Sequence, residues 1–335
     1  MKNNILTPSK TSSWLLAVVT LVFCFVHFPL FSNENETGKT ITETEAEATS
    51  ETEAEQESPE IVEPNEISEE ERKERRGKIV KTDHQDGLFT LHRYYNKETL
   101  EYSFYVTNES YDNLNLTLKL TLEQMEAYPA PTVQLIIPPL GADIHLITAK
   151  PIDPYKSHRF GAQAEFKQGD PQAIHDGTYA PPFEKNRGYY LANAFFGNLS
   201  HKGKYAVDFN MPVGTMVCAA REGVVVRMKN DGNRGGPSPS FNDDGNYISI
   251  LHRDGTYGNY AHFRQGGVLV KVGDTIEVGQ EIGYSGNTGY STGPHLHFDV
   301  SKANGRGGFT TLPFQFRKSD GTLLDPETGM TLVND

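Results

Sequence analysis

Two histidines separated by a single residue are the side chains of this sequence with the clearest potential for chemistry. His295 and His297 lie in the stretch Gly-Pro-His-Leu-His-Phe, where a loop rich in Gly, Ser and Thr gives way to residues typical of a strand. Successive side chains of a strand alternate between its faces, so both imidazoles project from one face, about 6 to 7 Å apart along the backbone. Such a pair is half of a metal site.

Three residues upstream could complete that site: His201, Asp208 in Tyr-Ala-Val-Asp-Phe, and His262 in Asn-Tyr-Ala-His-Phe. Imidazole and carboxylate groups suit Zn²⁺, and three protein ligands leave a fourth position for water, as in catalytic zinc sites. Bound zinc lowers the pKa of water from about 15.7 to about 7 and polarises a carbonyl group. Histidines that are not ligands can transfer protons near neutral pH.

The segment from about Asn198 to Val300 resembles the lysostaphin/LytM-type zinc endopeptidases, which cut peptide bonds in bacterial peptidoglycan. The resemblance rests on the order of the motifs: a first His and an Asp, then Tyr-Ala-His, then Gly-Pro-His-Leu-His-Phe. It implies an antiparallel β-sheet peptidase domain that holds one zinc ion per chain. It also implies the site residues, with His201, Asp208 and His297 as zinc ligands and His262 and His295 as catalytic residues.

The spacing of the first two ligands departs from the compact form of that family motif. Six residues separate His201 from Asp208, where the compact motif has three. Seven positions along one continuous strand would place the two side chains on opposite faces. The chain must therefore turn between them, and Gly203 is the expected place because glycine tolerates turn conformations. His201 would then reach the metal from a loop, while Asp208 lies on a strand.

The elements that must position these residues are strands. Leu114, Leu116, Leu118, Leu120 and Leu122 alternate with polar residues, which predicts a strand with one buried face. Further short strands are expected at 102–106, 133–137 and 144–148. The fold class is therefore all-β: a small β-sandwich-like domain at 78–188, a peptidase domain at 189–317 and a C-terminal tail at 318–335. Whether the first domain positions the enzyme, binds other envelope proteins or occludes the active site stays open.

The start of the chain predicts export. Lys2 and Lys10 precede an apolar run at 14–31, the order of a secretory signal peptide or an N-terminal membrane anchor within residues 1–33. Eighteen helical residues would span about 27 Å, just enough for a bilayer core. No clear Ala-x-Ala cleavage site follows, so an uncleaved anchor in the inner membrane is an open alternative to cleavage. We expect the protein in the cell envelope, either periplasmic or extracellular.

An acidic tract follows this segment and accounts for the net charge. Residues 34–74 contain sixteen Glu and only three cations, a surplus equal to the net charge of −13 of the whole chain. Such a composition buries too little apolar surface to fold, which predicts a disordered linker over 34–77. The remainder of the chain is electrically balanced, so nothing in the sequence indicates nucleic-acid binding.

The remaining histidines and cysteines have ordinary interpretations. His252 precedes a turn, and we expect it to pack or hydrogen-bond structurally. Cys218 is the only thiol outside the N-terminal apolar run, so it has no disulfide partner in the folded part, and a buried position is expected. The histidines at 84, 92, 145, 158 and 175 show no ligand-like spacing.

The sequence favours a zinc endopeptidase that hydrolyses the peptide stems and cross-links of peptidoglycan. One alternative is a non-catalytic regulator of other cell-wall hydrolases that keeps the same fold. Retention of all five site residues argues against it. A second alternative is a carrier barrel, because Gly279–Gly286 resembles the hairpins of lipoyl-type domains, but the expected exposed lysine is missing. The bond that is cut, D-alanyl to diaminopimelate or a glycine bridge, stays open, with a weak preference for the direct cross-link.

Overall fold

Alternating apolar side chains build two sheets in the first half of the folded chain. The computed structural model describes residues 19–22, 74, 76–198 and 200–335. One antiparallel sheet contains, in spatial order, β2 (Lys78–Gln85), β3 (Phe89–Asn96), β4 (Glu101–Asn108), β8 (Ile144–Pro151) and β6 (Met125–Tyr128). A second contains β1 (Val19–Val22), β9 (Arg159–Gln168), β5 (Leu114–Glu123) and β7 (Thr132–Ile137).

The core of this sandwich lies between the two sheets. On β5, the four leucines from Leu114 to Leu120 are buried, as their alternation predicts, and Leu122 packs against the same core. Phe89 of the first sheet stacks on Phe166 of the second with 3.6 Å between ring centroids. The strands predicted around 102–106, 133–137 and 144–148 are β4, β7 and β8, which confirms the all-β class of this region.

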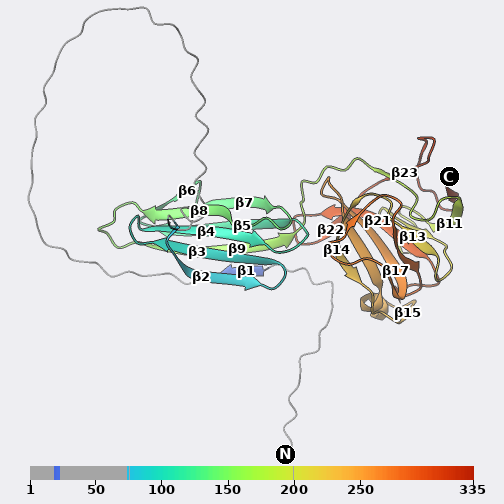
Figure 1. Ribbon diagram of the computed structural model, residues 1–335, viewed down its shortest axis with the longest axis horizontal. Helices are drawn as coiled ribbons and strands as arrows, with labels where there is room; N and C mark the ends of the chain where they lie inside the picture. The colour runs from blue at the N-terminus through green and yellow to red at the C-terminus, as the bar shows by residue number, and fades with distance from the viewer. Residues whose placement is uncertain (1–18, 23–73, 75, 199) are drawn as a thin grey trace, which may run out of the picture.

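A larger antiparallel sheet forms the second half of the chain (Figure 1). Its spatial order is β18 (Thr275–Ile276), β14 (Gly223–Lys229), β16 (Asn246–Leu251), β17 (Tyr257–Val268), β21 (Leu296–Ala303), β12 (Ala206–Phe209), β11 (Arg187–Asn193) and β25 (Thr331–Asn334). Strands β13 (Met216–Cys218), β19 (Glu281–Ser285) and β22 (Phe309–Thr311) pair beside this path. Its core is separate from that of the sandwich and rich in aromatic rings. Cys218 of β13 is buried and forms no disulfide among the described residues.

Short elements complete the second half. Strands β10 (Thr178–Tyr179), β23 (Gln315–Arg317) and β24 (Leu323–Leu324) form a three-stranded sheet. Strands β15 (Gly235–Gly236) and β20 (Gly289–Tyr290) pair next to a 3₁₀ helix, η1 (Pro239–Asp244), which Ser238 caps by accepting a hydrogen bond from the Ser240 amide. No helix in the described residues has the length and apolar character needed to cross a bilayer.

Residues 318–335, expected as a tail, contribute to the second core. Strand β25 pairs antiparallel with β11, and Leu332 is completely buried. The physical reason is the edge that β11 would otherwise expose: unpaired backbone groups of an edge strand are satisfied by a further strand. The predicted domain limits at 188 and 317 remain predictions.

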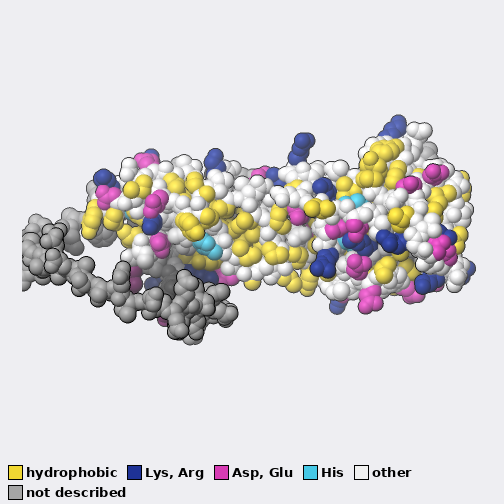
Figure 2. All heavy atoms as spheres, turned by 90° about the horizontal axis from the view of Figure 1, so that it is seen from above, with side chains coloured by type: hydrophobic (Ala, Val, Ile, Leu, Met, Phe, Trp, Pro, Cys, Tyr) yellow, Lys and Arg dark blue, Asp and Glu magenta, His cyan; other side chains and the backbone are white. Residues whose placement is uncertain are grey.

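Most of the N-terminal segment lies outside the described residues. Of the apolar run 14–31, only β1 is described, and its backbone pairs antiparallel with β9, Val19 opposite Phe166. The acidic tract is outside the described residues except for Glu74. The signal peptide or anchor and the disordered linker therefore remain predictions. On the face seen in Figure 2, acidic and basic side chains are interspersed over the peptidase half, in keeping with the balanced charge of the chain beyond residue 74.

A buried ion pair joins the sandwich to the larger sheet. Asp112 is 3% exposed, accepts a hydrogen bond from Tyr257 Oη at 2.5 Å and pairs with Arg227 Nη1 at 2.9 Å. Gly169 allows this close approach, because a Cβ at that position would lie 2.8 Å from the Cβ of Ala303. Removing one partner of such a pair would leave an uncompensated buried charge. The contact therefore stabilises the docking of the sandwich on the larger sheet.

This interface is remote from the histidines of the expected site. It contacts the first residue of β17, Tyr257, and the last residue of β21, Ala303, whereas His262 and His297 lie five and six residues away along the same strands. At about 3.3 Å per residue, that distance is roughly 17 to 20 Å. The sandwich therefore docks at the end of the sheet away from these histidines.

Burial of His252 makes the stability of this half depend on pH. The ring is 2% exposed and Nδ1 donates to the Glu222 carbonyl at 2.7 Å, while buried Nε2 has no hydrogen-bond partner among the described residues. Burial lowers the pKa of His252 to about 4. The unfolded chain, with a pKa of about 6.5, takes up a proton first as the pH falls, so stability is lost between about pH 6.5 and pH 4.

We therefore expect His252 to contribute about 2 to 3 kcal/mol to the loss of unfolding free energy between pH 7 and pH 4.5. A His252→Gln variant, which can still donate to Glu222, should lose less stability than wild type over that interval. Denaturant unfolding at both pH values measures the difference, and other titrating groups cancel because they are common to both proteins. An equal loss in the two proteins would contradict the prediction.

Candidate active site

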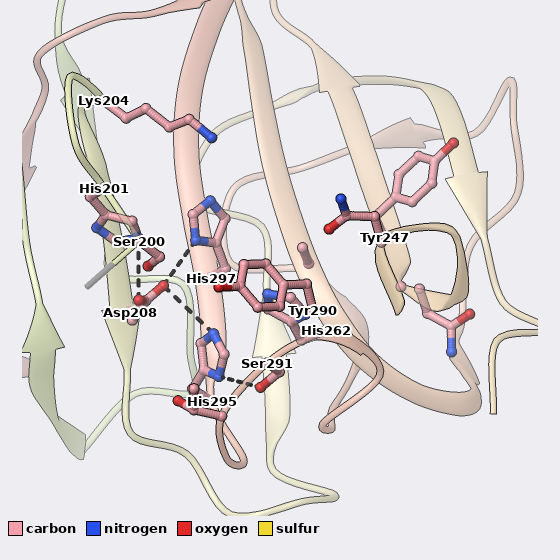
Figure 3. Close-up of a pocket in the computed structure, with 15 residues that line it drawn as sticks. Ser200, His201, Lys204, Asp208, Tyr247, His262, Tyr290, Ser291, His295 and His297 are labelled. Atoms are coloured by element: carbon pink, nitrogen blue, oxygen red, sulfur yellow. Dashed lines mark hydrogen bonds and ion pairs between the residues drawn. The ribbon is translucent and has the colours of Figure 1, made fainter. Parts of the chain in front are cut away.

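Three neighbouring strands carry Asp208, His262 and His297 of the predicted site, and His295 directly precedes one of them. In the order β17, β21, β12, the strands pair antiparallel, and His297 is the Cα partner of both Ala261 and Asp208. The pairing therefore sets His297 directly beside Asp208 and one residue from His262. All five predicted residues line one cavity, as Figure 3 shows.

His201 comes from a loop, as its spacing from Asp208 predicts. The chain turns at Gly203, whose φ is +71°, and Lys204 N donates to the His201 carbonyl at 2.9 Å. His201 Nδ1 donates to the Ala194 carbonyl at 3.1 Å, which directs Nε2 towards Asp208. This buried Nε2 lies 3.2 Å from Asp208 Oδ2, yet among the described residues it makes no hydrogen bond of acceptable geometry. A ring held in this way fits a metal ligand.

His201, Asp208 and His297 form a donor set for a metal ion. One ligand atom from each lies within 4.8 Å of the others, and His297 Nδ1 is 2.9 Å from Asp208 Oδ1. Burial opposes the charged form of Asp208, but the adjacent imidazoles of His201 and His297 hold its pKa well below the usual range. Burial likewise opposes protonation of His297, but the carboxylates of Asp208 and Asp299 raise its pKa to about 10. The surroundings of these ligand atoms thus favour positive charge.

A β-bulge determines the direction of His262. The register of β17 against β16 shifts so that Tyr247 is opposite Ala261 and Asn246 opposite Phe263, which leaves His262 as the extra residue. Its φ is +71°, a conformation rare outside glycine. Bulges of this kind redirect a side chain next to an active site. The buried Asn246 amide donates to the Phe263 carbonyl at 3.2 Å and so stabilises the bulge.

His262 and His295 face one another beside the donor set. Their ring centroids are 4.5 Å apart, and His295 Nε2 lies 3.7 Å from Asp208 Oδ1. Nδ1 of His262 donates to the Thr288 carbonyl at 2.7 Å, and Nδ1 of His295 donates to the Gly293 carbonyl at 2.7 Å. Burial, with the neighbouring histidines, lowers the pKa of His262 to about 3, and burial lowers that of His295. In each ring, Nε2 is the nitrogen left to accept a proton.

The cavity around these residues is large enough for a peptide. Its volume is about 760 Å³. One wall comes from the 231–245 segment, the start of β16 and β20, with Asn242, Gly245, Tyr247 and Tyr290. The opposite wall comes from the His201 loop, with Ser200 and Lys204. Asn246 also lines the cavity, and its backbone N–H donates to Thr288 Oγ1 at 3.0 Å, which joins the base of the first wall to the loop before β21. The shape of this wall was not predictable from the sequence.

Asp299 belongs to the site and was missed by the sequence analysis. Its Oδ2 lies 3.2 Å from His297 Nε2, and its Oδ1 accepts from Asn259 Nδ2 at 2.8 Å. A proton on Nε2 is thereby held by Asp299, which leaves Nδ1 of His297 free for a metal. A signal was present, because His295, His297 and Asp299 occupy alternate positions of one strand and share a face.

We expect the Asp299→Ala variant to bind its metal about 10- to 100-fold more weakly than wild type, the usual effect of removing a carboxylate that orients a ligating histidine. Competition with a chelator measures the affinity. Asp299→Asn, which keeps an acceptor oxygen, should lie between the two, and Asp243→Ala, an exposed acid on η1, serves as the control. Wild-type affinity in Asp299→Ala would contradict this role.

A second group of His and Asp residues lies outside the cavity. His175, Asp176 and Asp254 come close enough to hold a cation. Arg221, however, pairs with Asp176 at 2.9 Å and with Asp254 at 2.8 Å. The guanidinium already supplies the positive charge, so the group is an ion-pair cluster, in agreement with the ordinary role expected for His175.

Comparison with known proteins agrees with this geometry. The sequence profile described as Peptidase family M23 matches residues 202–308, beginning one residue after His201. Peptidoglycan DD-endopeptidase ShyA from Vibrio cholerae is 41% identical over 93 residues, which is 28% of this chain and 19% of that protein. Lysostaphin from Staphylococcus simulans is 40% identical over 118 residues, 35% of this chain and 22% of that protein. The glycyl-glycine endopeptidase ALE-1 from Staphylococcus capitis is 37% identical over 153 residues, 45% and 38% respectively.

The crystallised catalytic domain of lysostaphin from Staphylococcus simulans is 33% identical and covers 38% of this chain and 87% of that domain, with a TM-score of 0.27. The chain spans between 19% and 38% of the length of the three relatives named above. The family profile covers the part of the chain that carries Asp208, His262, His295 and His297. Residues 202–308 therefore form a peptidase family M23 domain.

Proposed function

We propose that this protein is a zinc-dependent endopeptidase that hydrolyses peptide cross-links of bacterial peptidoglycan. The observation that carries the proposal is the meeting of His201, Asp208 and His297 with His262 and His295 in one cavity of an M23 domain. The relatives ShyA and lysostaphin, a peptidoglycan DD-endopeptidase and an antimicrobial peptidase by name, support the same substrate class.

His201, Asp208 and His297 would hold one zinc ion per chain, because two imidazoles and a carboxylate are a donor set of catalytic zinc. Zinc, when bound, supplies the Lewis acidity that activates water and polarises a scissile carbonyl. The Ala194 carbonyl and Asp299 fix the ring nitrogens of His201 and His297 that do not face the ion. Their part is to orient the ligands before substrate arrives.

His262 and His295 would move protons and stabilise developing charge. Both rings are tethered through Nδ1 to backbone carbonyls, so each offers Nε2 as a proton acceptor in a fixed direction. Burial lowers the pKa of both imidazoles and so disfavours their protonated forms, and a base must be unprotonated to accept a proton. The two tyrosines that line the cavity, Tyr247 and Tyr290, would contact a bound peptide.

The setting proposed for this reaction is the cell envelope. The relative ShyA, which is named as a peptidoglycan endopeptidase, supports an envelope or extracellular location. We propose that the N-terminal segment exports the protein and, if uncleaved, anchors it in the membrane. Peptide stems are the proposed partners of the cavity, and the sandwich, whose docking leaves the cavity open, is available to position the enzyme or to contact other envelope proteins.

The test is digestion of purified peptidoglycan sacculi by the full-length chain, followed by mass analysis of the released muropeptides. We expect cross-linked dimers to disappear and monomers to accumulate, and a chelator to stop the reaction until zinc is restored. Glycan fragments with intact peptide cross-links, or binding of sacculi without any cleavage, would contradict the proposal. The second of these outcomes is the behaviour of a non-catalytic regulator.

A further inference from the structure

Lys204 is the single lysine or arginine among the residues that line the cavity. The only acid in the same lining is Asp208, which is committed to the donor set. Figure 3 shows the Lys204 side chain extending from the His201 loop towards the space above His297. Among the described residues, no carboxylate forms an ion pair with this ammonium group. Its charge is therefore available to a bound substrate.

The backbone holds Lys204 in a fixed place. Lys204 N donates to the His201 carbonyl at 2.9 Å, and the Lys204 carbonyl accepts from Phe196 N at 3.0 Å. The next residue, Tyr205, donates through N to Thr311 Oγ1 at 2.9 Å. Because these hydrogen bonds already fix the backbone of Lys204, binding of a ligand costs little further backbone entropy. Lys204 is therefore better suited to a specific contact than a lysine on a mobile loop would be.

The irregular spacing of the ligands explains why a cation can occupy this position. Six residues separate His201 from Asp208, and the turn at Gly203 places Lys204 three positions after His201. A shorter connection would lead from the loop ligand directly into β12. The additional residues thus add a positive charge to the cavity wall beside the metal ligands.

We propose that Lys204 binds a free carboxylate of the substrate close to the cleaved bond. The inference rests on the proposed function and narrows its substrate class. In a direct cross-link, the amide nitrogen sits on the carbon of diaminopimelate that also bears a free carboxylate. A glycine bridge has no such carboxylate. Lys204 therefore selects direct cross-links, in which an ammonium and a carboxylate form a charge-assisted hydrogen bond.

The experiment compares two synthetic cross-linked peptide dimers that differ only at this carboxylate, free in one and converted to a carboxamide in the other. With the full-length, zinc-loaded chain, kcat/KM should favour the free carboxylate by about 10- to 100-fold, the range for hydrogen bonds to charged groups. Lys204→Met should bring the ratio close to one, and Lys204→Arg should keep a preference. Lys202→Met, an exposed lysine of the same turn that does not line the cavity, should keep the wild-type ratio.

Calorimetric binding of both dimers to the His262→Asn variant, in which turnover is expected to be about 10²- to 10⁴-fold slower, gives a second measurement of the same preference. Equal kcat/KM values of wild type for the two dimers would overturn the inference while the proposed function stands. So would an unchanged ratio of these kcat/KM values in Lys204→Met at unaltered zinc content. If wild type cleaves neither the dimers nor the sacculi, the proposed function fails. The ratio of the two calorimetric affinities then decides by itself whether Lys204 binds the carboxylate.

Discussion

Replacing Asp208 or His297 by alanine is expected to release the proposed zinc and to abolish peptide hydrolysis. Each change removes one of three protein ligands, and Asp208 also lies within 4 Å of His201, His295 and His297. Loss of Asp208 leaves the buried imidazoles without their shared carboxylate, so both the affinity for the metal and the order of the site should fall. Metal content after dialysis, and competition with a chelator, measure the first effect.

The matched control is His92→Ala, which removes an imidazole from the sandwich and should retain stoichiometric zinc. Circular dichroism of all variants separates loss of metal from loss of fold. Full retention of zinc by Asp208→Ala or His297→Ala would refute the ligand assignment. His201→Ala is the most informative third variant, because wild-type affinity there would show that another residue completes the donor set despite the position of Nε2 beside Asp208.

Changes at His262 and His295 should separate binding of the metal from chemistry. We expect both His262→Asn and His295→Ala to keep the zinc but to lose about 10² to 10⁴ in kcat, the usual contribution of a positioned general acid or base. Asparagine is chosen for position 262 because it tolerates the left-handed backbone conformation better than alanine, so the bulge should survive the change. Steady-state kinetics on a soluble cross-linked peptide, with metal content measured on the same samples, provide the comparison.

Two outcomes would contradict this division of roles. Loss of zinc in His295→Ala, with retention in His297→Ala, would mean that the two histidines of the His-Leu-His pair have exchanged functions. Activity near the wild-type level in His262→Asn would remove that residue from the reaction. Tyr290→Phe, a change on the cavity wall that leaves the ring in place, is a useful comparison because its effect should fall mainly on KM.

Patterns of alternation made the larger part of the fold predictable. The leucines of β5 alternate over ten residues, and one buried face follows directly from that period. His295 and His297 share a face for the same reason. The direction of the His262 side chain was not predictable, because the single extra residue in β17 changes the register of the strands and has no signature in the sequence. The contact of Asp112 with Arg227 was also hidden, since it joins residues 115 positions apart on two separate cores.

The membership of residues in the site was easier to predict than its walls. Imidazole and carboxylate groups in the order found here leave few alternatives to a metal site. Asn246 and Thr288, by contrast, are common polar residues whose role depends on their hydrogen-bond partners. Both side chains donate to the Phe263 carbonyl, at 3.2 Å and 2.6 Å. Such roles depend on tertiary contacts that a single sequence does not display.

The pairing of β12 with β21 has a consequence for the order of events during folding. Asp208 and His297 are 89 residues apart in the chain but direct partners across these two strands. Contacts between residues so far apart in the chain form late in folding, because closing the long loop between them costs chain entropy before the contacts stabilise it. A metal ion that needs both side chains therefore binds after the sheet has closed, and cannot serve as a nucleus for it. The ion would instead slow unfolding, because β12 and β21 could not separate without breaking its bonds to Asp208 and His297.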